Sequence, residues 1–159
     1  MIDEINRLSC HAKGISLLAF SHNSKQLVSV GTEDEPLIVV WDVEQGSVVT
    51  STINTGSVND ISILSNPDEL IFATVGNQSF KMWKIDPETM EDLLYLDIPL
   101  VDNESNLTAI ASINSMPAPY NCSILLLGDS EGGIVVYTPE SNEFIAKINK
   151  VVQGSIGLI

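Results

Sequence analysis

The sequence has 159 residues, of which 44% are hydrophobic, and its formal net charge is −14. This apolar content is too high for a disordered chain, and the length suffices for one domain with a sizeable core. Only seven Lys and Arg residues stand against 21 acidic ones, and they do not cluster. Binding to nucleic acid or to an anionic membrane surface needs concentrated positive charge, so both are disfavoured.

Cysteine usage and the N-terminal segment indicate the cellular compartment. Cys10 and Cys122 have neither the spacing of a metal site nor that of a disulfide framework. The segment MIDEINRLSC lacks the basic start and long apolar stretch of a secretory signal, and no apolar run has membrane-spanning length. We therefore expect a cytoplasmic protein in a reducing compartment.

The most informative stretch runs from Gln26 to Gly46. An apolar run ends at Gly31, a polar loop follows over Thr32–Pro36, and a second β-branched run ends in Trp41-Asp42. Two β-rich runs joined by a short polar loop predict a hairpin.

The pattern of this hairpin recurs along the chain without any helical periodicity. Trp41 and Trp83 stand 42 positions apart (83 minus 41), and Gly31 and Gly76 stand 45 apart (76 minus 31). Gly128 follows after 52 (128 minus 76), which indicates an insertion in a third copy. Repeats of roughly 40–45 residues are typical of propeller blades. The predicted strands are Ile2–Ser9, Ile15–Phe20, Gln26–Gly31, Leu37–Val43, Ser47–Thr52, Val58–Leu64, Leu70–Gly76, Ser79–Ile85, Leu93–Ile98, Leu107–Ile113, Ser123–Gly128, Ile134–Thr138, Glu143–Ile148 and Ser155–Ile159.

On these residues the chain resembles a WD-repeat β-propeller over essentially its whole length. The expected fold class is all-β, a partial WD-repeat propeller of four-stranded antiparallel blades. Three blades would occupy residues 11–53, 54–99 and 100–150, the last of them degenerate. Residues 1–10 would form the outer strand of a preceding blade, and residues 151–159 would start the next. Three blades cannot close a ring, so we expect the chain to be part of a larger folding unit.

The resemblance implies a structural hydrogen-bond network in the first blade, formed by His11, Ser29, Asp34 and Trp41. A buried indole N–H and a buried imidazole need hydrogen-bond partners, and a shared network satisfies both. The loop before the third strand is longer than is usual in the family, so Glu35 remains the alternative to Asp34.

The later copies depart from this pattern. In the second, Thr55-Gly56 stands in the place of His11, and Lys84 follows Trp83 where the family has Asp. In the third, Tyr137-Thr138 replaces Trp-Asp. Only the first blade is therefore expected to hold the full network.

No catalytic, cofactor-binding or metal-binding residues are predicted. Ser29, His11 and Asp34 have the composition of a catalytic triad, but the resemblance assigns them to internal hydrogen bonding. The acidic run 33–35 lacks the alternating spacing and glycine of a calcium loop. Gly132-Gly133 is interpreted as a tight turn, because no helix follows that would complete a phosphate site.

The resemblance implies a non-catalytic protein-interaction scaffold within a larger intracellular assembly. Its expected partners are other proteins, bound through the loop faces of the propeller, with neither nucleic acid nor membrane among them. The degenerate repeats are similar to those of flagellum-associated WD-repeat proteins, which makes the cilium and the axonemal cytoskeleton the first expected location. A kinase-signalling WD-repeat scaffold is the alternative, followed by a propeller enzyme whose site lies outside this segment.

Overall fold

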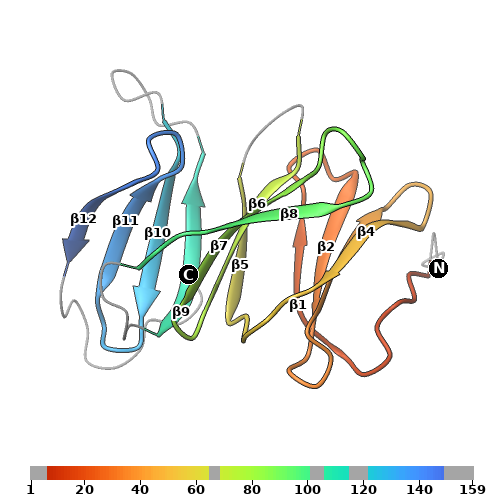
Figure 1. Ribbon diagram of the computed structural model, residues 1–159, viewed down its shortest axis with the longest axis horizontal. Coiled ribbons are helices and arrows are strands. Elements are labelled where there is room, and N and C mark those ends of the chain that lie inside the picture. Colours follow the sequence, from red (N-terminus) through yellow and green to blue (C-terminus); the bar gives the residue numbers. More distant parts are fainter. Residues whose placement is uncertain (1–6, 65–68, 101–105, 115–121, 149–159) are drawn as a thin grey trace, which may run out of the picture.

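Figure 1 shows the computed structural model, which describes residues 7–64, 69–100, 106–114 and 122–148. The regular elements of these residues are twelve β-strands that form three four-stranded antiparallel sheets. In this part of the chain no helix is long and apolar enough to cross a membrane. The predicted all-β class with four-stranded antiparallel blades is confirmed.

Each sheet is a meander of consecutive strands, and the three sheets are denoted blades 1, 2 and 3. Blade 1 contains β1 (Ile15–Phe20), β2 (Gln26–Gly31), β3 (Leu37–Asp42) and β4 (Ser47–Ile53). Blade 2 contains β5 (Asp60–Leu64), β6 (Ile71–Gly76), β7 (Ser79–Ile85) and β8 (Leu93–Asp97). Blade 3 contains β9 (Leu107–Ile113), β10 (Ile124–Asp129), β11 (Ile134–Thr138) and β12 (Glu143–Ile148).

The first expected strand, Ile2–Ser9 within residues 1–10, lies mostly outside the described residues. Of its length only residues 7–9 are described, and they carry no strand. Leu8 instead packs against Leu27, Val39 and Trp41 on one face of blade 1. Residues 1–6 and the strand predicted at 155–159 lie outside the described residues.

The middle strands of blades 1 and 2 are buried on both faces. In β2 and β6 five of six residues are buried, because each sheet packs against a neighbour on either side or against a covering segment. This two-sided burial explains why these strands are continuous apolar runs rather than alternating ones. Figure 1 shows the sheets standing side by side. Clusters of buried apolar side chains join blade 1 to blade 2 and blade 2 to blade 3.

The two interblade cores have the same construction. Between blades 1 and 2, valines and Ile38 of β2 and β3 pack against Phe72 and Trp83. Between blades 2 and 3, Phe80 of β7 meets Tyr137 of β11 in an edge-to-face contact, with ring centroids 5.0 Å apart. Trp83 of blade 2 and Tyr137 of blade 3 therefore each face the preceding blade, whereas Phe80 faces the following one.

The innermost strands lie closest together, since β5 contacts both β1 and β9. Asp60, at the start of β5, accepts a hydrogen bond from the backbone N–H of Ile110 in β9 (2.9 Å) and is 5% exposed. Farther along, the Ser112 hydroxyl donates to the carbonyl of Ile63 (3.0 Å). These polar contacts fix the register of blade 3 against blade 2.

Candidate functional site

The structure brings together three of the four residues predicted for the network in blade 1. Ser29 pairs with Val39 and Leu27 pairs with Trp41, so Ser29 and Trp41 share one face of the sheet. The Trp41 indole N–H donates to the Ser29 hydroxyl oxygen (2.7 Å), and His11 Nε2 lies 2.7 Å from the same oxygen. Ser29 and Trp41 are 1% and 3% exposed.

The carboxylate beside this network belongs to Glu35. Its two oxygens accept hydrogen bonds from the backbone N–H groups of Ala12 (2.9 Å) and Lys13 (2.8 Å). These two bonds lower the pKa of Glu35, with a smaller contribution from the charge of His11. In the described residues neither Asp34 nor Glu35 bonds to His11, Ser29 or Trp41, so the network observed there has three members, and Glu35 is the acid that lies beside it.

The buried Nδ1 of His11 has no hydrogen-bond partner among the described residues. A catalytic triad needs an acid on that nitrogen to orient the imidazole, and it needs a serine that can reach its substrate. Here the acid binds backbone amides, and the Ser29 hydroxyl is buried and already accepts the indole N–H. The three residues therefore have the composition of a triad without its geometry.

Blade 2 keeps a reduced form of the network. Phe72 pairs with Trp83 as Leu27 pairs with Trp41, and the Trp83 indole N–H donates to the Thr74 hydroxyl (2.8 Å). Thr74 is thus the counterpart of Ser29.

In blade 3 the network takes another form. Leu125 pairs with Tyr137, which makes Leu127 the counterpart of Thr74 and leaves no hydroxyl at that place. The Tyr137 hydroxyl donates instead to Asn142 Oδ1 (2.5 Å). Burial raises the pKa of Tyr137, since its charged form would lose solvation. By this register Asp129, rather than Gly128, corresponds to Gly76.

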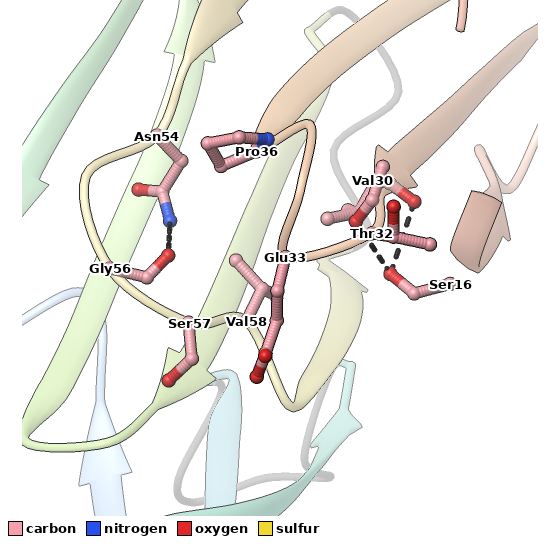
Figure 2. Close-up of a pocket in the computed structure, with 10 residues that line it drawn as sticks. Ser16, Val30, Thr32, Glu33, Pro36, Asn54, Gly56, Ser57 and Val58 are labelled. Carbon is pink, nitrogen blue, oxygen red and sulfur yellow. Dashed lines mark hydrogen bonds between the residues drawn. The ribbon is translucent and has the colours of Figure 1, made fainter. Parts of the chain in front are cut away.

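A cleft of about 200 Å³ opens between blades 1 and 2, on the side where β2 turns into β3. Figure 2 shows its two walls: the β2–β3 loop with Thr32, Glu33 and Pro36, and the β4–β5 linker with Asn54 and Ser57 among others. The exposed carboxylate of Glu33 is among the lining side chains (Figure 2), so the cleft favours a cationic group. The Glu35 side chain points away from the cleft, toward Ala12. Among the described residues, no three His, Cys, Asp or Glu side chains lie close enough together to hold a metal ion.

Sequence reasoning missed Lys81, which lies behind the linker wall of this cleft. It is 5% exposed, and its ammonium group donates to Asn54 Oδ1 (2.8 Å) and to the Thr55 carbonyl (3.3 Å). The same group lies 4.8 Å from the ring centroid of Tyr95 and 5.7 Å from that of Trp83. The available signal was its position two residues before Trp83, which places it on the same buried face.

No protein-family model matches the sequence. The chain is 34% identical over 86 residues to cilia- and flagella-associated protein 52 of Mus musculus, a match that covers 52% of this chain and 14% of that protein. The Chlamydomonas reinhardtii protein of the same name is 34% identical over 84 residues, covering 52% and 13%. Centriole proteome protein 16 of Chlamydomonas reinhardtii is 33% identical over 88 residues, covering 55% and 4%. The matched segment thus spans 14% or less of each of these relatives.

Solved propellers superpose on nearly the whole chain. The β-propeller domain of Myceliophteria thermophila Cps50 (Swd1) gives a TM-score of 0.73 at 21% identity, over 95% of this chain and 46% of that one. The computationally designed Ika4 protein gives 0.70 at 20% identity, over 99% and 86%. The WD40 repeats of RRP9 give 0.69 at 12% identity, over 95% and 43%. With its three consecutive four-stranded blades, the chain therefore has the WD-repeat β-propeller fold.

Proposed function

We propose that this chain is part of a non-catalytic protein-interaction scaffold of cilia or flagella. The observation that carries the proposal is the likeness of about half the chain to cilia- and flagella-associated protein 52 at 34% identity. A further relative, centriole proteome protein 16, is named for the centriole. The fold alone would not suggest a location, because one fold serves many functions.

The structure supports a binding role over a catalytic one. Among the described residues, the constellation that resembles a catalytic group is His11 with Ser29; the Ser29 hydroxyl accepts the indole N–H of Trp41 and is buried out of reach of a substrate. What the described surface offers instead is an interblade cleft with the Glu33 carboxylate among its lining residues, and acidic loops on a chain of net charge −14. Such a surface favours basic partner proteins, and it disfavours direct docking onto acidic tails such as those of tubulin.

The test is the location and the neighbours of the intact protein. A tagged form is expressed in ciliated cells and in non-ciliated cells of the same source, then imaged and used for proximity labelling. We expect enrichment along the cilium, with structural axonemal proteins as neighbours. A diffuse or spindle-pole pattern with protein kinases as neighbours would move the assignment to the kinase-scaffold alternative. Turnover of a small molecule by the purified intact protein would overturn both.

A further inference from the structure

The outer strand of each blade is a sheet edge with backbone groups that have no partner within the sheet. Such edges invite pairing with another chain, and natural proteins protect them with bulges, lysines, prolines or polar residues. The three outer strands β4, β8 and β12 can therefore be compared by the protection each one carries.

Two of the three edges are protected. The pairing of β4 with β3 is irregular between Val40 and Trp41, and four of its seven residues are Ser or Thr. The pairing of β12 with β11 is irregular between Val136 and Tyr137, and the strand carries an exposed lysine. Both strands thus show features that discourage addition of a further strand.

Strand β8 lacks these features. Its register against β7 is regular from Leu93 to Asp97, and its sequence LLYLD contains no Lys, Pro, Gly, Ser or Thr. Three consecutive apolar residues are exposed: Leu94 (41%), Tyr95 (53%) and Leu96 (57%). A run of exposed apolar residues in a regular edge strand is a liability unless it serves binding.

The exposure of β8 is not caused by the absence of a neighbouring blade. Strand β8 is the outer strand of the middle blade, between β4 and β12 (Figure 1), so both neighbouring blades are already in position. The Tyr95 ring is held 5.0 Å from the ring centroid of Trp83 and 4.8 Å from the Lys81 ammonium group. A rigid, half-exposed aromatic side chain is a favourable anchor for a partner.

Charge identifies the kind of occupant. Exposed carboxylates stand at both ends of β8, with Glu88, Glu91 and Asp92 before it and Asp97 at its end. If a second copy paired antiparallel around Tyr95, Asp97 of one copy would lie beside Leu93 of the other, next to its Asp92, at each end. Like charges in those places destabilise a pair, and the chain carries a net charge of −14. A partner segment with basic ends would instead be attracted by the carboxylates at both ends of β8.

We propose that the outer edge of β8 binds an extended segment of a partner protein, which adds to blade 2 as a fifth strand. Backbone groups of the segment pair with the edge, its apolar side chains cover the three exposed residues of β8, and its basic ends face the flanking carboxylates. This inference rests on the proposed scaffold function and names the surface and the chemistry of one partner.

The probe is an acetylated, amidated and fluorescently labelled peptide, KVTVTVK, whose binding to the intact protein is followed by fluorescence anisotropy. Two control peptides carry Glu at both ends (EVTVTVE) or Pro in the middle (KVTPTVK). The variant Leu96→Lys adds an edge-protecting charge, and Ile145→Lys is its matched control on the bulged strand β12, where Ile145 is 54% exposed. Because both positions are exposed, neither change should alter the melting temperature.

Of the three peptides, we expect only KVTVTVK to bind. Its binding should slow hydrogen exchange of the amides in residues 93–97. Leu96→Lys should weaken binding by about tenfold or more, since it removes apolar cover and repels a basic peptide. Ile145→Lys should leave binding unchanged. Equal binding to Leu96→Lys, or no binding at all, would overturn the inference. Equally tight binding of EVTVTVE, or self-association through β8, would overturn the inference that the partner segment has basic ends. None of these outcomes depends on ciliary location, so the scaffold proposal can fail or stand separately.

Discussion

Replacing Ser29 by alanine should destabilise blade 1 by more than replacing Thr74 by valine destabilises blade 2. The Ser29 hydroxyl contacts two ring nitrogens, those of Trp41 and His11, whereas the Thr74 hydroxyl accepts one bond from Trp83. Ser29 and Thr74 are almost equally buried, at 1% and 2% exposure. The comparison therefore isolates the contribution of the additional imidazole.

The magnitude follows from the groups left without a partner. Stranding one buried donor costs about 1–3 kcal/mol, which is the expected loss for Thr74→Val because valine keeps the side-chain shape. Ser29→Ala strands the indole N–H and also the half-buried His11 nitrogen, so we expect a loss of about 2–4 kcal/mol.

Hydrogen exchange of the intact protein measures the two losses locally, with amides of β3 reporting on blade 1 and amides of β7 on blade 2. Ser29→Thr is the matched control, because it keeps the hydroxyl and installs the residue that blade 2 already uses at Thr74. Its loss should be smaller than that of Ser29→Ala. A loss for Ser29→Ala that equals or falls below that for Thr74→Val would refute the reasoning, since His11 would then draw no stability from Ser29.

Three further changes test other parts of the structure. Trp41→Ala should cost about 3–5 kcal/mol in urea unfolding of the intact protein, and an unchanged midpoint would show that the indole is not structural. Gly76→Ala should destabilise by about 1–3 kcal/mol or more, because the added Cβ would lie 1.9 Å from the Ser57 carbonyl oxygen; a melting temperature equal to that of the parent would contradict this close approach. The raised pKa of Tyr137 stabilises the fold fully below the unfolded tyrosine pKa of about 10, and this contribution is lost as the pH rises through the higher folded value. The melting temperature should therefore fall above that pH, and Tyr137→Phe should remove part of the fall; an identical alkaline profile for the variant would count against it.

The strands were predictable because their signals are local. Strand β2 ends at Gly31 as expected, and the reason is a close contact, since a Cβ there would lie 2.1 Å from the Glu35 carbonyl oxygen. Gly76 has the same role in blade 2. A strand that is buried on both faces and ends at such a glycine can be recognised from its own residues, without information about the rest of the chain.

The same glycine rule misplaces the register of blade 3 by one residue. The position that corresponds to Gly76 is occupied by Asp129, whose buried carboxylate accepts hydrogen bonds from the backbone N–H groups of Glu131 (2.9 Å) and Gly133 (2.7 Å). The turn is held by this side chain together with a backbone hydrogen bond from the Asp129 N–H to the Gly133 carbonyl (3.0 Å), so the closing position of the strand does not require glycine. A single sequence does not distinguish these two ways of closing a hairpin.

The choice between Asp34 and Glu35 was ambiguous for a related reason. Neighbouring carboxylates in a loop have the same chemistry, and the direction of each depends on the turn. Here the Glu35 N–H donates to the Thr32 carbonyl (2.9 Å), which turns the Glu35 side chain toward residues 12 and 13. Glu33 is left along the cleft. Only the conformation of the loop separates a structural acid from one available to a partner.

Lys81 explains why the two interblade contacts are not interchangeable. By register its counterparts are Val39 in blade 1 and Val135 in blade 3, both apolar. Burying an ammonium group is costly unless it is hydrogen-bonded, and its described partners are the neutral oxygens of Asn54 and Thr55 and two aromatic rings. The charge therefore holds the linker that forms one wall of the cleft between blades 1 and 2. Between blades 2 and 3 the described polar ties instead include a carboxylate on a backbone amide and a serine hydroxyl on a backbone carbonyl, both in the innermost strands. Because the cleft wall depends on a buried cation, its shape is a property of this sequence that the propeller fold alone does not dictate.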